Sequence, residues 1–229
     1  MPFHRRHGAI LLLLALALTL PLYKGARAQT SGDLTLVSEY AGRGVALYTR
    51  SALQLRVEHD TAAGWYGGAF ASPVTLDNRT QGQLTAYAGK ARRLTSTLSW
   101  DAGVTRNTYL RDKRRNYHEF YAGVALQRAS ARVFYSPAYY GEGRSVYLDL
   151  SGAYPLTDTV RLAAHVGVLH PFAYDGVAAK HSADVRIALV TDVGDVTLQA
   201  GWQARWRTYL PDFPKPRAFT ASASASYHF

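Results

Sequence analysis

Apolar and polar side chains alternate without a break through the last eleven residues of the chain, Phe219 to Phe229. The apolar positions are alanines in the middle and aromatic residues at the ends, whereas the alternate positions carry Thr, Ser and His. This period of two indicates a strand, because successive side chains of a strand point to opposite sides of the pleat. An apolar face with aromatic ends is typical of a strand that faces lipid. We predict that it pairs with the first strand in a closed barrel, since an unpaired edge invites aggregation; an edge strand of a secreted sandwich is the alternative.

The same alternation recurs from residue 34 onward, and short and long connections follow one another in turn. We therefore predict an all-β protein, an antiparallel up-and-down transmembrane β-barrel of about 12 strands. An even strand number places both ends of the chain at the periplasmic rim, which carries the tight turns. A long loop is expected through Pro73, Asp77 and Asn78, and another from Arg106 to Asn116. The expected strands cover residues 34–40, 53–58, 65–72, 82–91, 95–105, 117–127, 131–137, 145–154, 160–169, 182–191, 196–206 and 219–229.

Aromatic residues lie near the ends of these strands, as in the two girdles of a membrane barrel. The strand order predicts Trp65, Tyr154, Tyr227 and Phe229 at the periplasmic level, and Tyr40, Trp206 and Phe219 on the lipid face at the other level.

The first 28 residues have the features of a secretory signal peptide, with a charged start, an apolar run from Ala9 to Leu20 and the small-residue site Ala26-Arg27-Ala28. The apolar run is shorter than the roughly 20 residues that a spanning helix needs. We expect residues 1–28 to be removed on export, and residues 29–229 to form a barrel in the outer membrane of a Gram-negative bacterium. The chain has no cysteine, which excludes a lipoprotein anchor and any disulfide.

Net charge narrows the expected partners. The formal charge of +10 falls to +6 once the signal peptide, which holds four cations and no acid, is removed. A basic excess can indicate nucleic acid, but export argues against that partner. Anionic solutes and anionic lipid headgroups fit an exported barrel better.

Charged residues fall almost entirely on the strand face opposite the apolar one. A cation facing lipid at the bilayer midplane costs about 2–4 kcal/mol, so this face is expected to line the lumen. Such residues can form a polar pore, or they can pair with one another and fill the lumen. Barrels of about eight strands are filled by side chains, and those of about sixteen are open, so twelve lies between the two. The predicted pore-lining residues are Arg56, Glu58, Asp101, Glu119, Arg132, Asp149, Arg161, His165, Asp184, Arg186, Arg205 and Arg207.

Basic residues also gather in the expected loops. They outnumber the neighbouring Asp112 and are predicted to attract anions to the entrance or, alternatively, to contact lipopolysaccharide phosphates. These predicted pore-mouth residues are Arg43, Arg106, Arg111, Lys113, Arg114 and Arg115.

An enzymatic barrel is the main alternative of another class, because some outer-membrane barrels cleave lipids or peptides. No His-x-Ser pair, which would place a base beside a nucleophile, occurs in the chain. His170, Asp175 and His181 share one expected loop, which is a weak signal for a peptidase. We predict no catalytic, cofactor-binding or metal-binding residue. A structural or adhesive barrel is a third option, but it usually has longer external loops.

Several short motifs follow one another along the chain. They are Thr35-Leu-Val-Ser-Glu-Tyr40 followed by Arg43-Gly44, Trp65-Tyr-Gly-Gly68, Tyr121-Ala-Gly123, Tyr135-Ser-Pro137 and Tyr147-Leu-Asp-Leu150. In this order they resemble the motifs of the TorF-like family of proteobacterial putative outer-membrane porins, although Glu39 replaces the family's usual Asp and Gly42 an aromatic residue.

The resemblance implies a porin-type channel for small hydrophilic solutes, anions included, and supplies no particular substrate. The terminal aromatic strand also resembles the assembly signal of outer-membrane barrels, which makes Tyr227 and Phe229 its candidate residues. The implied partners are outer-membrane lipids, lipopolysaccharide and the barrel-assembly machinery.

Overall fold

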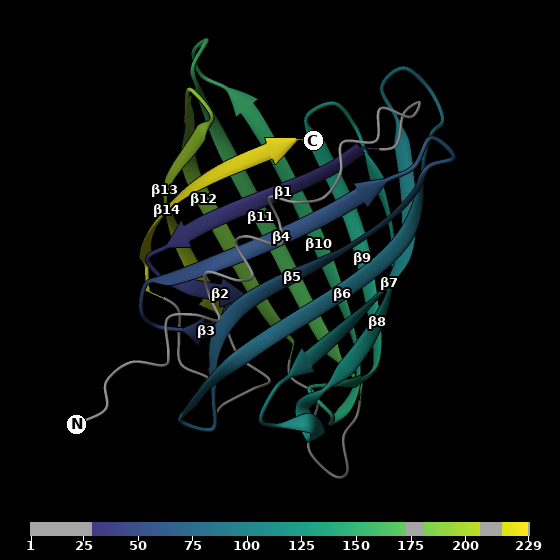
Figure 1. Cartoon of the computed structure of the whole chain (residues 1–229), viewed down its shortest axis with the longest axis vertical. Coiled ribbons are helices and arrows are strands. Elements are labelled where there is room, and N and C mark those ends of the chain that lie inside the picture. The colour runs from purple at the N-terminus through teal and green to yellow at the C-terminus, as the bar shows by residue number, and fades with distance from the viewer. Residues whose placement is uncertain (1–28, 173–180, 207–216, 229) are drawn as a thin grey trace, which may run out of the picture.

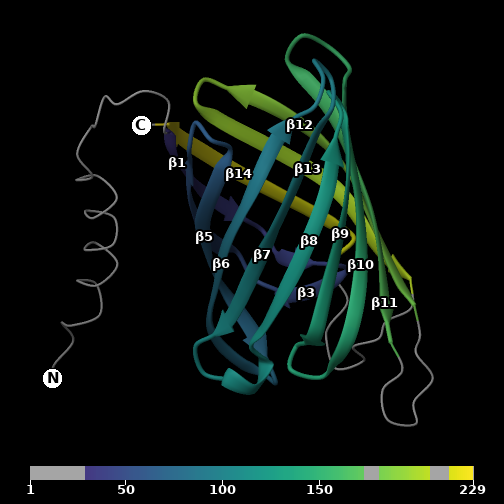
Figure 2. The ribbon, with the colours of Figure 1, turned by 90° about the vertical axis from the view of Figure 1, so that its right-hand side faces the viewer.

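The computed structural model describes residues 29–172, 181–206 and 217–228. Within these residues, twelve antiparallel strands close into one barrel in the order β1-β14-β13-β12-β11-β10-β9-β8-β7-β6-β5-β4 (Figures 1 and 2). The prediction of an all-β antiparallel barrel of about twelve strands is therefore confirmed. The strands are β1 (Gln29–Val37), β4 (Ala52–Asp60), β5 (Trp65–Leu76), β6 (Arg79–Arg93), β7 (Ser99–Tyr109), β8 (Tyr117–Ala125), β9 (Ala129–Tyr139), β10 (Gly143–Pro155), β11 (Val160–Pro171), β12 (Ser182–Val193), β13 (Val196–Trp206) and β14 (Phe219–His228).

Three short elements complete the described part. β2 (Tyr40–Gly42) and β3 (Val45–Tyr48) form a separate two-stranded sheet, and η1 (Lys113–Arg115) is a single 3-10 turn. Across the described ranges, the structure has no helix long and apolar enough to cross a membrane.

The first and last barrel strands pair with each other, as predicted. Ser31 lies opposite His228 and Val37 opposite Ser222 in an unbroken antiparallel register. The apolar residues of β14 thus lie beside those of β1 on the same face of the sheet. The pairing of the two strands leaves no free sheet edge in the barrel. Phe229 and the side chain of Tyr227 lie outside the described residues.

The two rims of the barrel differ in their connections. The rim where β1 begins and β14 ends, called the turn rim, has the short turns 61–64, 94–98, 126–128, 156–159 and 194–195. The opposite rim, called the loop rim, holds connections from two to fourteen residues long and lies at the bottom of Figure 1.

The prediction of a long loop through Pro73, Asp77 and Asn78 is wrong. β5 continues through Pro73 to Leu76, and only Asp77 and Asn78 connect it to β6. Both residues have a left-handed backbone, with φ of 47° and 59°. This is the conformation of a type I′ turn, whose twist matches that of the flanking strands.

Large apolar side chains cover the outside of the barrel. Leu34 and Leu36 of β1 lie opposite Leu55 and Leu53 of β4, and all four are exposed. Such a surface is stable only against lipid, because each exposed leucine in water forgoes about 1.5–3 kcal/mol of burial free energy.

The aromatic girdles agree with the prediction in part. Trp65 and Tyr154 are exposed at the turn rim, and Trp206 and Phe219 at the loop rim. Tyr40 is the exception. It belongs to β2 and packs against Phe70, with ring centroids 5.8 Å apart, on the inside of the barrel. The expected first strand was too long because β1 ends at Val37 and the chain then turns inward.

The interior near the loop rim is a hydrophobic core. Side chains from the loop-rim ends of several strands meet residues of β3 there, which closes part of the lumen by packing. Its buried members are Val45, Leu47, Val74, Leu76, Tyr109, Tyr117, Tyr139, Tyr140, Tyr147 and Leu169.

Candidate functional site

The hairpin of residues 38–51, which contains β2 and β3, folds into the lumen. Its turn consists of Arg43 and Gly44, with φ of 50° and 70°. A Cβ atom on Gly44 would lie 2.8 Å from the Asp184 Cβ and 3.0 Å from the Arg205 Cγ. Glycine is therefore favoured at this position both by its backbone conformation and by the close approach to the wall, and a side chain here requires the hairpin tip to shift away from the wall.

Arg43, at the tip of the hairpin, contacts the wall on the far side of the lumen. In the ring order, β8, β9 and β10 lie opposite β1 and β4, from which the hairpin emerges. The two Arg43 Nη atoms donate to the Glu119 Oε atoms of β8 at 2.6 and 2.9 Å. The guanidinium also lies over the rings of Phe134 and Tyr147, at 4.9 and 4.5 Å from their centroids.

This ion pair is largely buried, with 16% of the Arg43 side chain and 5% of the Glu119 side chain exposed. Burial alone lowers the pKa of Arg43, but the Glu119 carboxylate outweighs it with the help of nearby tyrosines, and the net pKa is well above the ordinary value. The guanidinium thus stays charged. A charged bidentate pair of this kind fixes both position and orientation.

The base of the hairpin is also anchored. Glu39 Oε1 accepts a hydrogen bond from Gln203 Nε2 at 3.1 Å and from the backbone N–H of Arg217 at 2.8 Å. Arg217 also donates through Nη2 to the Thr49 carbonyl oxygen at 2.7 Å, and Ser38 pairs with Ala221. The hairpin is therefore attached to β13 and β14 at its base and to β8 at its tip.

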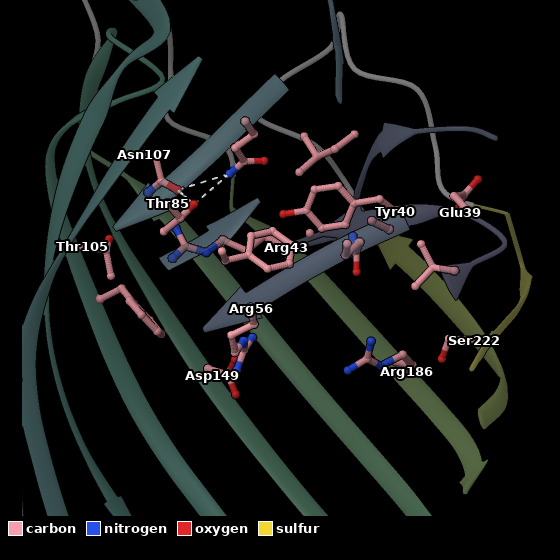
Figure 3. A pocket seen from close by; sticks show the side chains of 18 of the residues that line it. Glu39, Tyr40, Arg43, Arg56, Thr85, Thr105, Asn107, Asp149, Arg186 and Ser222 are labelled. Carbon is pink, nitrogen blue, oxygen red and sulfur yellow. Dashed lines mark hydrogen bonds between the residues drawn. The ribbon is translucent and has the colours of Figure 1, made fainter. Parts of the chain in front are cut away.

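The hairpin borders two polar cavities in the lumen. The larger is about 530 Å³ and lies between the hairpin's Tyr40 and Arg43 on one side and Arg56 and Arg186 on the other (Figure 3). The smaller, about 240 Å³, contacts Arg43, Gly44 and the walls of β10 to β12. Burial raises the pKa of Tyr40 to about 12, so its hydroxyl remains protonated.

A hydrogen-bonded cluster lies beside the smaller cavity. His165 Nε2 is 2.9 Å from Asp184 Oδ1, and His165 Nδ1 is 3.5 Å from Asp149 Oδ1. Ser151 Oγ lies 3.2 Å from His165 Nδ1 but donates to Asp149 at 2.9 Å. The three residue types are those of a Ser-His-Asp triad. The serine hydrogen, however, points to Asp149 rather than to the imidazole, so the histidine does not take its proton here.

Most inner carboxylates are paired. Asp101 bonds to Arg132 at 2.7 Å and Asp192 to Arg161 through both oxygens, and Asp149, Asp184 and Glu119 are engaged as described. Glu58 lies on the inner face of β4, two positions from Arg56. Arg207 lies outside the described residues.

Three of the predicted pore-lining arginines have no carboxylate within ion-pair distance in the described ranges. They are Arg56 on β4, Arg186 on β12 and Arg205 on β13. Arg56 and Arg186 are exposed to the larger cavity, whereas Arg205 lies against Gly44 and its Nη1 is buried without a hydrogen bond. Arg56, which lies opposite Asp33 in the strand register, and Arg186 therefore border the larger cavity as cations outside the ion pairs of the described residues.

The structure places the predicted pore-mouth residues in four different ways. Arg43 was wrongly placed at the mouth, because it is buried against Glu119 inside the barrel. Arg106 was wrongly placed in a loop, since it lies in β7 and points outward like Val104. Arg115 is at the rim but contacts Asp77, Asp112 and Glu142. The remaining members, Arg111, Lys113 and Arg114, border a cavity of about 540 Å³ at the loop rim.

Several lumen residues were missed by the sequence reasoning, which followed charge alone. The larger cavity is also bordered by uncharged polar side chains and by Tyr40 and Phe70. The signal that could have found the hairpin was the short apolar run from Val45 to Tyr48 directly after Arg43-Gly44, which is a strand after a turn inside what looked like a loop.

In the described part of the chain, no group of three or more His, Cys, Asp or Glu side chains has an arrangement that could hold a metal ion. His170 and His181 stack with centroids 4.5 Å apart, but His170 lies in β11 rather than in the loop, and Asp175 lies outside the described residues.

A twelve-stranded closed barrel with an apolar outside and a charged inside has the architecture of a transmembrane β-barrel. Comparison with solved structures agrees. A KdgM porin has a TM-score of 0.57 at 11% identity, covering 87% of this chain and 99% of that one. A NanC porin gives 0.53 at 10% identity, covering 87% and 98%. An outer membrane channel from Pseudomonas putida F1 gives 0.54 at 14% identity, covering 92% and 100%. At these identities the likeness shows the fold.

The sequence model of a bacterial family matches residues 25–203, and the chain belongs to this family, described as "Bacterial protein of unknown function (Gcw_chp)". The description of this family does not confirm the TorF-like name. A comparison with curated proteins finds no match.

Proposed function

We propose that this protein is an outer-membrane channel for the passive diffusion of small hydrophilic solutes, with anions preferred. One observation carries the proposal: the polar lumen cavity of about 530 Å³ is bordered by Arg56 and Arg186, which have no carboxylate partner in the described part of the chain. Unpaired cations in a confined space of low dielectric attract anions strongly. The porin fold supports the same conclusion.

The hairpin of residues 38–51 sets the cross-section of this channel. It spans the lumen from β1 and β4 to β8, and its β3 residues join the hydrophobic core at the loop rim. Solutes therefore pass beside the hairpin, and its two anchors determine how wide the passage is.

Export and assembly complete the proposal. Residues 1–28 act as a cleaved signal peptide, and the terminal strand with Tyr227 and Phe229 is recognised by the barrel-assembly machinery. Outward Arg106 and the rim residues Arg111, Lys113 and Arg114 contact lipopolysaccharide phosphates. The TorF-like motifs support a porin of that kind. A KdgM porin described in complex with disordered oligogalacturonate has this fold at 9% identity and a TM-score of 0.50.

Reversal potentials of the reconstituted protein across a KCl gradient test the proposal. We expect anion selectivity at low salt that declines toward 1 M, where the Debye length falls from about 10 Å to about 3 Å. Arg56→Gln combined with Arg186→Gln should abolish the preference. Arg161→Gln combined with Asp192→Asn is the matched control, because it removes a paired cation together with its carboxylate and leaves the net charge unchanged. Cation preference at low salt would refute the anion preference, and absence of conductance would favour a barrel filled by its own side chains.

A further inference from the structure

The two unpaired arginines of the larger cavity lie on either side of a polar strip. In the ring order, β1, β14 and β13 separate Arg56 on β4 from Arg186 on β12. Arg186 lies directly opposite Gln203 in the register of β12 and β13. The strip offers both hydrogen-bond donors and acceptors, through the amides and hydroxyls of Gln199, Gln203, Thr220 and Ser222.

Each arginine is available to a carboxylate. Both side chains are exposed in the lumen. Asp149, an acid that borders the same cavity, already accepts from Ser151 at 2.9 Å and lies 3.5 Å from His165. A guanidinium binds a carboxylate through two parallel hydrogen bonds, which gives orientation as well as affinity. An incoming carboxylate would thus meet two guanidinium groups that form no ion pair with the described residues.

An aromatic pair also borders the cavity. Tyr40 of the hairpin and Phe70 of β5 have ring centroids 5.8 Å apart at an interplanar angle of 59°. The face of an aromatic ring is electronegative, so it attracts the weakly positive C–H hydrogens of a saturated ring. Tyr40 adds a protonated hydroxyl beside this surface. The cavity therefore combines cations, a hydroxyl-binding strip and an apolar face.

We infer that this cavity is a binding subsite for a small hydroxylated carboxylate, that is, a sugar acid of monosaccharide size. The carboxylate pairs with Arg56 or Arg186, the hydroxyls bond to the amide and hydroxyl strip, and the C–H face of the sugar ring lies against Tyr40 and Phe70. A volume of about 530 Å³ lies within the usual size range of small-molecule sites. The inference rests on the proposed function, because the solute must enter the lumen to reach the subsite.

Two measurements on the full barrel test the subsite. Calorimetric titration of the detergent-solubilised protein with glucuronate measures binding without any requirement for conduction. Blockade of KCl current in planar bilayers by glucuronate measures the same site during transport. We expect glucuronate to act at a concentration at least about tenfold lower than glucose or acetate, since each lacks one group that the site recognises.

Variants assign the effect to residues. Arg56→Gln with Arg186→Gln should lower the affinity for glucuronate at least about tenfold, because charge-assisted hydrogen bonds are lost. The affinity for glucose should stay unchanged. Phe70→Leu should weaken the binding of glucuronate and leave the binding of acetate unchanged. Arg161→Gln combined with Asp192→Asn, which removes both members of an ion pair near the turn rim and leaves the net charge unchanged, should change none of these affinities.

The outcomes separate this inference from the channel itself. Conductance without preference for glucuronate overturns the subsite and leaves the channel. Glucuronate binding without conductance supports the subsite and overturns the channel. If the double arginine variant loses affinity for glucose and for glucuronate equally, Arg56 and Arg186 are not the residues that bind the carboxylate.

Discussion

Arg43 and Glu119, 76 residues apart in sequence, form a bidentate ion pair that fixes a hairpin across the lumen of the barrel. The pair lies among the rings of Phe134, Tyr139 and Tyr147, where little water reaches it. Removing water strengthens the attraction but makes either charge costly when left alone. The tip of the hairpin is therefore held firmly, and changing one partner should release it.

Glu119→Gln should release the hairpin tip. The substitution leaves Arg43 charged and buried without a carboxylate, which typically costs about 3–5 kcal/mol. We expect a lower temperature for loss of the folded form in SDS gels and a larger single-channel conductance. Glu142→Gln is the control, because Glu142 pairs with Arg115 at the rim with 33% of its side chain exposed, and an exposed pair contributes only about 0–1 kcal/mol. Unchanged conductance and stability in Glu119→Gln would contradict the role of the pair.

A disulfide should hold the hairpin in place. The natural chain has no cysteine, so Gly44→Cys with Asp184→Cys introduces a single possible pair. An ideal Cβ at residue 44 lies 2.8 Å from the Asp184 Cβ, so a small outward shift gives the roughly 3.5–4.5 Å of a disulfide. We expect the oxidised protein to conduct steadily at the lowest level and reduction to raise conductance. Both single variants serve as controls, and equal conductance in the oxidised and reduced states would mean that the hairpin does not move.

Val166→Arg should impair membrane insertion far more than Arg161→Ala. Val166 points outward from the middle of β11 with 45% of its surface exposed, and an arginine there would cost about 2–4 kcal/mol. Arg161 points inward near the turn rim and pairs with the exposed Asp192, so its loss should cost about 0–1 kcal/mol. The measurement is the yield of heat-modifiable protein in outer-membrane fractions. Similar yields would show that the orientation of β11 is wrong.

Deletion of Phe229 should reduce assembly. The terminal strand closes the barrel against β1, and its last aromatic residue is the proposed recognition signal for the assembly machinery. We expect less inserted barrel and more periplasmic, protease-sensitive protein. Phe229→Trp retains an aromatic terminus and should assemble normally. Normal insertion of the truncated chain would refute the signal.

The sequence by itself determined the barrel. Alternation with a period of two assigns each side chain of a strand to lipid or lumen, and the cost of a charge in lipid makes that assignment unambiguous for residues such as Val166 and Arg161. Closure by β14 against β1 followed from the same pattern. These features depend on local periodicity and on the solvent on each side, both of which can be read along the chain.

Only the tertiary structure decided what occupies the lumen. Arg43 and Tyr40 looked like a mouth residue and a girdle residue, because charge and alternation alone do not show that residues 38–51 turn inward. Their positions depend on contacts with the neighbouring strand β5 and with β8, β9 and β10, which closure of the barrel brings to the opposite wall. In the same way, the pairing of Asp101 with Arg132 and the unpaired state of Arg56 and Arg186 depend on distances across strands, which no pattern along the chain contains.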